Sequence, residues 1–142
     1  MATNAIKPSV VGPVLTDKAD YILKALRDCR NHIKVLSDEI ADKECEAAAV
    51  QDELAKAKAK AFVDAATVTR PDGKLAFPNI DAQKAQAELT VHTDEYDAAL
   101  AAHRHMLNEI QKWKNLITCE HERRGDLKNE IELLKLLATE AN

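Results

Sequence analysis

The sequence predicts an all-α protein: a long antiparallel helical hairpin of the coiled-coil type, with a short helix in the connection and an N-terminal arm, assembled into an oligomer. Apolar residues recur in alternating strides of four and three over residues 22–61, a spacing that holds one face of a helix against a partner helix. Glycine (3) and proline (4) are rare among the 142 residues, as in proteins built of long helices. Pro71 and Gly73 supply a turn between the two long segments.

An extended arm is predicted over residues 1–15, because Pro8, Gly12 and Pro13 interrupt a helix. The arm is either loose or docked on a groove of its own or of a neighbouring subunit, and its apolar residues favour docking. We expect residues 16–142 to form a single helical-hairpin domain. Its helices are predicted at about 17–66, 81–90 and 94–138.

The first helix follows a cap at Thr16 or Asp17. Its seam consists of Ile22, Leu26, Cys29, Ile33, Leu36, Ile40, Lys43, Ala47, Val50, Leu54, Ala57 and Ala61. Lys43 is the one polar member: it either extends its ammonium group to water or pairs with an acid of the opposing helix and fixes the register. If the chain folds back at Pro71–Gly73, that acid is Glu120.

The connection is predicted to hold a short helix that Asn79 or Asp81 caps, with Ile80, Ala85 and Leu89 facing inward. Thr93 then caps the last helix, whose first turn is acidic. The seam of this helix is expected at Tyr96, Leu100, His103, Leu107, Ile110, Trp113, Ile117, Glu120, Arg124, Leu127, Ile131, Leu134 and Ala138.

Two features of the last helix depart from a regular apolar seam. It turns polar between Glu120 and Gly125, which indicates either a kink or a buried polar layer. Further on, the leucines form nearly a full ring around the helix, at Leu133, Leu134, Leu136 and Leu137. One partner helix cannot bury a whole ring, so we expect self-association.

Charge and cysteine content exclude several classes of protein. The net charge is −4, which excludes a globally basic nucleic-acid binder but leaves a local basic patch possible. The three cysteines contain no Cys-x-x-Cys pair and indicate free thiols in a reducing cytosol. The sequence has neither the apolar segment of a signal peptide nor a membrane-spanning run, so we expect a cytoplasmic protein without a membrane partner.

No motif for catalysis is present. The glycines form no phosphate-binding loop, and no nucleophile motif occurs, so we expect no enzyme and no cofactor. His103 and His105 are two residues apart, as are Cys119 and His121. Residues at this spacing point away from each other on a helix, so no metal site is expected.

A basic patch is the strongest candidate site. Residues 56–74 contain five basic side chains and two acidic ones; the basic ones are Lys56, Lys58, Lys60, Arg70 and Lys74. The patch is either a solvated helix end or a contact to nucleic-acid phosphates, strengthened by oligomerisation. Base stacking in such a complex requires an aromatic ring, which Phe62 and Phe77 offer.

The layout resembles the phage recombination mediator proteins of the UvsY type. The resemblance covers about residues 20–138 and consists of Lys-Ala-Lys-Ala-Phe at 58–62, a turn containing glycine, Thr-Asp-Glu-Tyr-Asp-Ala-Ala-Leu at 93–100, Gln-Lys-Trp-Lys-Asn-Leu-Ile at 111–117, Arg123-Arg124 and a leucine-rich end. It implies a helical hairpin that forms rings, binds single-stranded DNA and loads a RecA-like recombinase onto strands covered by single-strand binding protein.

The resemblance also implies a site and a location. Lys58 and Lys60 match a Lys-x-Arg pair that helps to bind DNA in that family, although lysine lacks the planar fork of arginine. Val63 and Asp64 stand where the family has an aromatic pair. The implied partners are further copies of the chain, single-stranded DNA, the recombinase and the single-strand binding protein, in the cytoplasm of a phage-infected cell.

Two functions are therefore predicted. The first is a non-enzymatic, oligomeric accessory factor that binds single-stranded DNA. The alternative is a coiled-coil protein-interaction module without a role in nucleic-acid binding: an assembly adaptor, a phage structural or scaffold component, or an inhibitor of a host enzyme.

Overall fold

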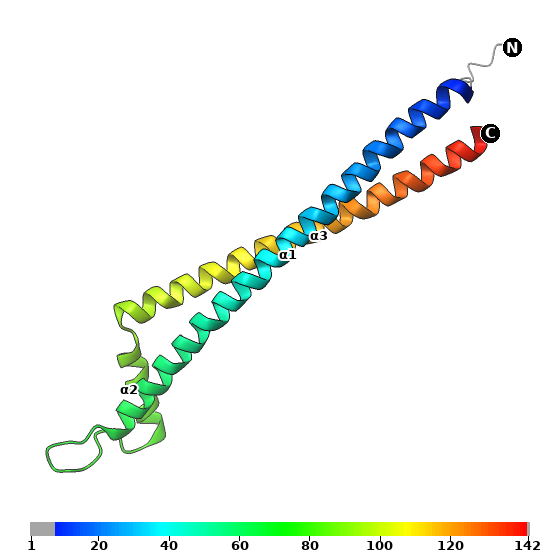
Figure 1. Cartoon of the computed structure of the whole chain (residues 1–142). Helices are drawn as coiled ribbons and strands as arrows, with labels where there is room; N and C mark the ends of the chain where they lie inside the picture. Colours follow the sequence, from blue (N-terminus) through cyan, green and yellow to red (C-terminus); the bar gives the residue numbers. More distant parts are fainter. Residues whose placement is uncertain (1–7, 142) are drawn as a thin grey trace. The chain divides into compact units, whose positions relative to one another are not determined.

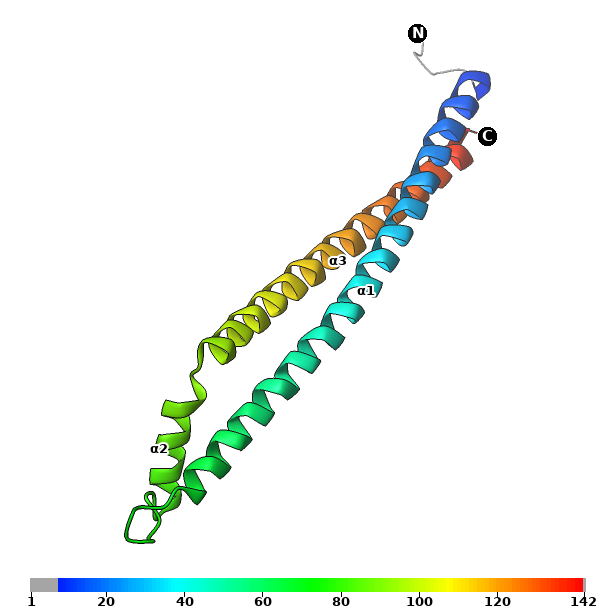
Figure 2. The ribbon, with the colours of Figure 1, turned by 60° about the vertical axis from the view of Figure 1, so that its left-hand side comes forward.

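The protein is all-α, as predicted. The computed structural model describes the backbone of residues 8–141 and the side chains of residues 15–140. In this part of the chain it has three helices, α1 (Pro8–Thr67), α2 (Ile80–Val91) and α3 (Asp94–Ala141), drawn in Figures 1 and 2. The β pairing in the described residues is limited to one isolated bridge between Thr69 and Leu75. No helix among them is long and apolar enough to cross a membrane.

The start of α1 differs from the prediction. The helix begins at Pro8, so the extended arm predicted over residues 1–15 is wrong from residue 8 onward, and residues 1–7 lie outside the described part. Proline suits the first turn of a helix, where the backbone N–H groups have no acceptor within the helix. Pro13 deprives α1 of one backbone hydrogen bond but does not end it.

The buried face of α1 is the predicted seam. All twelve seam positions are buried or half-buried; the fully buried ones are Ile22, Cys29, Leu36, Ile40, Ala47, Leu54 and Ala61. A seam that recurs every 3.5 residues on average winds slowly around a straight helix and keeps facing one partner when the helices supercoil.

By its internal contacts the chain divides into two compact units. We call residues up to Ile40, together with those from Lys112 onward, the terminal unit, and Ala41–Gln111 the middle unit. The prediction of a single domain over residues 16–142 is not tested by this division, since α1 and α3 each contribute residues to both units.

The core of the terminal unit joins one segment of α1 to one segment of α3. Its buried members are Ile22, Ala25, Cys29 and Leu127, and half-buried Leu26, Ile131 and Leu134 pack against them. Full burial of an aliphatic side chain contributes about 1.5–3 kcal/mol, so this cluster stabilises the pairing of the two segments.

A polar layer adjoins that core. Oε1 of Glu120 lies 3.4 Å from Nδ1 of His32, although the Glu120 side chain is only 16% exposed. Oε2 of Glu120 lies 4.0 Å from Nη1 of Arg123 and is buried without a hydrogen-bond partner. Burial, followed by a hydrogen bond to Glu120, raises the pKa of the Cys29 thiol. Residues 120–125 thus contribute a half-buried polar contact to the continuous helix α3, while none of its polar residues is fully buried in the described part of the chain.

The predicted pairing of Lys43 with Glu120 is wrong. Lys43 pairs with Glu46 in its own helix, at 3.3 Å, while Glu120 faces His32. The prediction assumed that the last helix starts beside the end of the first helix. Instead, α2 packs beside the last turns of α1 (Figures 1 and 2), so α3 pairs with α1 in a different register.

The middle unit has its own core. Buried residues of all three helices form it: Leu54, Ala61, Ala65, Ala87, Val91 and Tyr96. Three of the six are alanine, on both α1 and α2, which lets these two helices approach closely. Ala87 and Val91 are the buried residues of α2, whereas Ile80 and Leu89 are exposed and so is Ala85, so the inward face predicted for this helix is wrong.

The connections follow the predicted turn and caps. After α1 ends at Thr67, the backbone N–H of Arg70 donates to the carbonyl of Lys74 at 2.8 Å, and Gly73 has a φ of 85°, which favours glycine. Asn79 caps α2 by accepting a hydrogen bond from the N–H of Ala82 at 2.8 Å. Thr93 caps α3 by accepting one from the N–H of Tyr96 at 3.1 Å.

Candidate nucleic-acid interface

The predicted basic patch lies in the middle unit, partly at the end of α1 and partly in the turn that follows. Lys56, Lys58 and Lys60 are exposed near the end of α1. Residues four apart share a face of a helix and residues two apart do not, so Lys56 and Lys60 lie together while Lys58 points away from them. Lys56 is partly neutralised by Glu53, which lies 3.5 Å away. Because both side chains of that pair are about three-quarters exposed, the pair adds little stability.

Arg70 and Lys74 lie in the turn after α1. Nε of Arg70 is 3.6 Å from Oδ1 of Asp72, and the same oxygen accepts a hydrogen bond from the backbone N–H of Lys74 at 3.0 Å. These contacts leave the Lys74 ammonium group exposed at the turn. In this turn the guanidinium of Arg70 is paired with Asp72, whereas the ammonium group of Lys74 takes no part in that ion pair.

A groove between α1 and α2 brings a predicted site lysine and an aromatic ring together. It has a volume of about 340 Å³ and is lined by Lys58, Phe62, Lys84, Ala87, Glu88 and Val91. Ala87 and Val91 are buried and Phe62 is half-buried, so they form an apolar floor. Lys58 of α1 and Lys84 of α2 are exposed. Two cations thus border an apolar surface that includes an aromatic ring.

The two aromatic residues proposed for stacking have different surroundings. Both are half-buried and pack against the core of the middle unit. Phe62 also lines the groove. Phe77 lies in the connection, where its backbone carbonyl accepts a hydrogen bond from Nε2 of Gln83 at 3.0 Å. Of the two rings, Phe62 is therefore the one placed beside a predicted site lysine.

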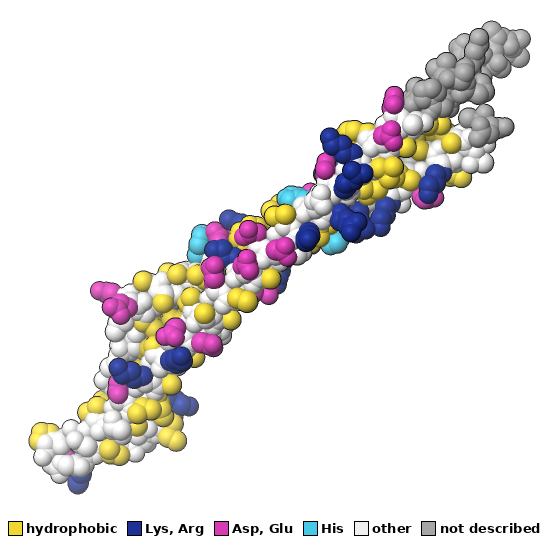
Figure 3. Space-filling model, viewed as in Figure 1, with side chains coloured by type: hydrophobic (Ala, Val, Ile, Leu, Met, Phe, Trp, Pro, Cys, Tyr) yellow, Lys and Arg dark blue, Asp and Glu magenta, His cyan; other side chains and the backbone are white. Residues whose placement is uncertain are grey.

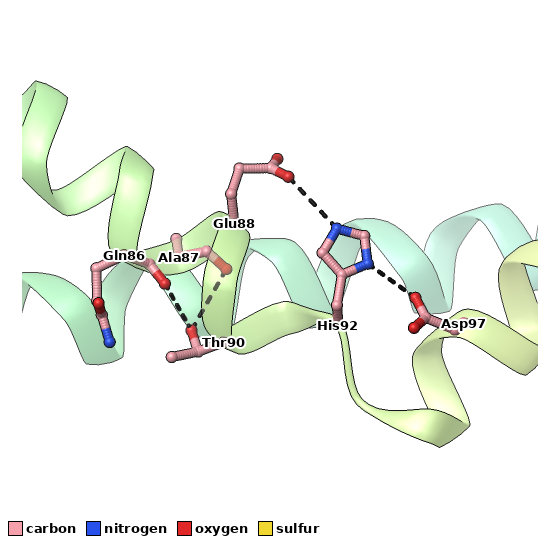
Figure 4. Close-up of polar contacts among 6 residues, drawn as sticks. All are labelled: Gln86, Ala87, Glu88, Thr90, His92 and Asp97. Carbon is pink, nitrogen blue, oxygen red and sulfur yellow. Dashed lines mark hydrogen bonds and ion pairs between the residues drawn. The ribbon is translucent and has the colours of Figure 1, made fainter.

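A polar cluster around one histidine, at the junction of α2 and α3, was not predicted. His92 follows α2, and its Nδ1 lies 2.8 Å from Oδ1 of Asp97, while its Nε2 lies 3.5 Å from Oε2 of Glu88 (Figure 4). Its ring meets Tyr96 edge-on, with the centroids 5.6 Å apart. The hydrogen bond to Asp97, followed by the contact with Glu88, raises the pKa of His92 above its ordinary value of 6.5.

Thr90 contacts the backbone at the same end of α2. Its hydroxyl donates to the carbonyls of Gln86 and Ala87, at 3.1 Å and 3.3 Å (Figure 4). The last turn of α2 is thereby tied to the turn before it. His92 directly follows the last turn of α2, and its ring contacts Glu88 on one side and Asp97 on the other.

Lys84 follows the basic patch in the sequence but was not assigned to the site, and His92 had no signal there. Lys84 stands in a stretch whose apolar residues do not select one face of the helix, and His92 falls in the short connection to α3. Their roles depend on which elements pack together. Among the described residues, no group of three or more His, Cys, Asp or Glu side chains is arranged to hold a metal ion. Comparison of the chain with family models, with curated proteins and with solved structures finds no match.

Proposed function

We propose that this chain is a non-enzymatic accessory factor that binds single-stranded DNA and, as the sequence resemblance implies, loads a RecA-like recombinase. The observation that carries the proposal is the juxtaposition of Lys58 and Phe62 in one groove. Single-strand binders combine cations that follow the phosphates with aromatic rings on which bases stack. Lys56 and Lys60 lie on another face of α1, where they could contact phosphates of the same strand.

We further propose that α1 and α3 form an antiparallel hairpin and that several hairpins associate. In the terminal unit the pairing of His32 with Glu120 and the core that includes Ile22 and Leu127 support the hairpin. Leucines of α3 support association, since Leu133, Leu136 and Leu137 are 60%, 61% and 51% exposed. Figure 3 shows hydrophobic side chains at the surface near the C-terminal part of α3.

Association would explain how a small patch could bind DNA usefully. One patch of a few lysines on a chain with a net charge of −4 binds weakly by itself. When several copies are joined, binding at the second and later patches becomes intramolecular, and the overall affinity can rise by two or more orders of magnitude. Ring formation and DNA binding are therefore two parts of the same proposal.

Fluorescence anisotropy of a labelled oligothymidylate tests this function. We expect micromolar, salt-sensitive binding that is lost in the double variant Lys58→Ala/Lys60→Ala. The matched control is Lys34→Ala, which removes an exposed lysine of α1 in the terminal unit. If each lysine contacts a phosphate, the two together account for about 1.4 of the slope of log K against log salt of the native protein, since each contact contributes about 0.7 for single strands. Unchanged anisotropy of the oligonucleotide with the native protein at low salt would refute the proposal.

The alternative, a protein-interaction module, is favoured by the same exposed leucines of α3. A leucine-bearing helix face can bind an amphipathic helix of another protein as well as a second copy. Affinity capture from native cells, with and without nuclease treatment, separates the two functions. Recovery of the same protein partners under both conditions, without DNA, would favour the module.

A further inference from the structure

The groove between α1 and α2 has the form of a subsite for one nucleotide. Its volume of about 340 Å³ lies at the lower end of the range of about 300–1,000 Å³ that is typical of small-molecule sites. The floor is apolar, and Phe62 offers part of a ring face. The cations stand on two different helices, Lys58 on α1 and Lys84 on α2, so they border the floor from both sides.

The two lysines that line the groove differ from Lys56 nearby. Lys56 has an acidic partner, Glu53, at 3.5 Å. Among the described residues no ion pair is formed by Lys58 or Lys84. A bound anion therefore need not displace an acidic side chain of this chain before it contacts them.

The one acidic residue of the groove is engaged elsewhere. Oε2 of Glu88 lies 3.5 Å from Nε2 of His92, and Figure 4 shows the Glu88 carboxylate directed toward the imidazole. The two lysines outnumber this single acidic residue in the lining of the groove. The groove consequently favours a ligand that joins a flat apolar ring to an anionic group, which is the chemistry of a nucleotide.

We infer that this groove holds one nucleotide of single-stranded DNA, with its base against Phe62 and its phosphate between Lys58 and Lys84. The inference rests on the proposed function and extends it to α2, where Lys84 becomes a DNA contact. It also makes the packing of α2 on α1 a requirement for full affinity, because neither helix supplies the whole subsite.

The test compares two strands and three variants. Anisotropy titrations use a labelled oligothymidylate and an abasic strand of equal length, with the native full chain, Lys84→Ala, Phe62→Leu and the control Lys34→Ala. Leucine keeps an apolar group at position 62, and circular dichroism checks that each variant retains its helices. The variant Lys84→Ala changes an exposed residue, so it tests the subsite even if Phe62→Leu fails to fold.

The expected effects differ between the variants. Lys84→Ala weakens binding of both strands about fivefold in 0.1 M salt, which is the factor that one contact with a salt slope of about 0.7 gives between 1 M and 0.1 M. Phe62→Leu weakens binding of oligothymidylate about fivefold or more, the effect of losing one stacked base, and leaves the abasic strand unchanged. The control binds both strands like the native protein.

Three results would overturn the inference while leaving DNA binding intact. The first is native affinity in both Lys84→Ala and Phe62→Leu. The second is equal affinity of the native protein for the two strands, which would indicate a plain anion site. The third is displacement of the strand by polyglutamate at equal charge, which would assign the groove to an acidic protein segment. Absence of oligonucleotide binding by the native protein would instead refute the proposed function as well.

Discussion

Two leucines of α3 provide a matched test of which surface is internal to the chain and which is available for association. Leu127 is 9% exposed and belongs to the core of the terminal unit, whereas Leu136 is 61% exposed. Truncating a buried leucine to alanine costs about 2–5 kcal/mol, depending on how well the site closes. The core of the terminal unit is small, so we expect Leu127→Ala to lower the free energy of unfolding by about 2–3 kcal/mol, the lower part of that range.

For Leu136→Ala the expected effect depends on protein concentration. Within one chain little burial is lost, so the change should stay within about 0.5 kcal/mol. If copies associate through this leucine, association stabilises the folded state by mass action, and the variant loses that part. Urea unfolding followed by circular dichroism, at two protein concentrations a hundredfold apart, measures both effects.

The outcome that contradicts this reasoning is specific. The native protein should become more stable at the higher concentration, and Leu136→Ala should show a smaller increase. Equal destabilisation by Leu127→Ala and Leu136→Ala at the lower concentration would show that Leu136 is buried within the chain. No loss of stability in Leu127→Ala would contradict the core of the terminal unit.

Three further predictions concern the middle unit and the thiols. The folded state raises the pKa of His92, so the protonated imidazole stabilises the fold below pH 6.5, and this stabilisation is lost as the pH rises through the folded-state pKa. The urea midpoints of the native protein and of His92→Asn should therefore differ at pH 5.5 and converge above pH 8. A difference that does not change with pH would contradict this. Gly73→Ala places a side chain at a φ of 85° with nothing within 4 Å of its Cβ, so unfolding should become easier by about 1 kcal/mol from backbone strain alone; an unchanged melting curve would show that the turn adopts another conformation. A thiol reagent should label Cys45 and Cys119, which are exposed, and spare the buried Cys29 until the protein unfolds; rapid labelling of Cys29 would contradict its burial.

The sequence predicted the helices and the buried faces of the long ones well because both depend on local periodicity. The α1 seam is confirmed throughout. In α3 the exception is Leu107, which is 48% exposed; the periodicity alone does not explain it. Caps and the turn were also predictable, because Asn79, Thr93 and Gly73 each satisfy a local requirement of the backbone.

Features that depend on packing between elements were not predictable in this way. α2 has apolar residues on all sides, so the sequence did not decide between the face with Ile80 and the face with Ala87. The register that sets Glu120 against His32 depends on where α3 starts beside α1. The lysines at the end of α1 were visible as a charge pattern, but the approach of Lys84 to Lys58 depends on the same packing of α2.

The most direct test of the central claim, an oligomer that binds single-stranded DNA, is the molar mass by light scattering after size-exclusion chromatography, with and without an unlabelled single-stranded oligonucleotide. We predict a mass that is a multiple of the single-chain value of 15.7 kDa and that increases by at least one oligonucleotide when DNA is added. A mass of one chain that does not change on addition of the oligonucleotide would contradict both halves of the claim. An oligomer whose mass does not change would contradict DNA binding and leave the protein-interaction module.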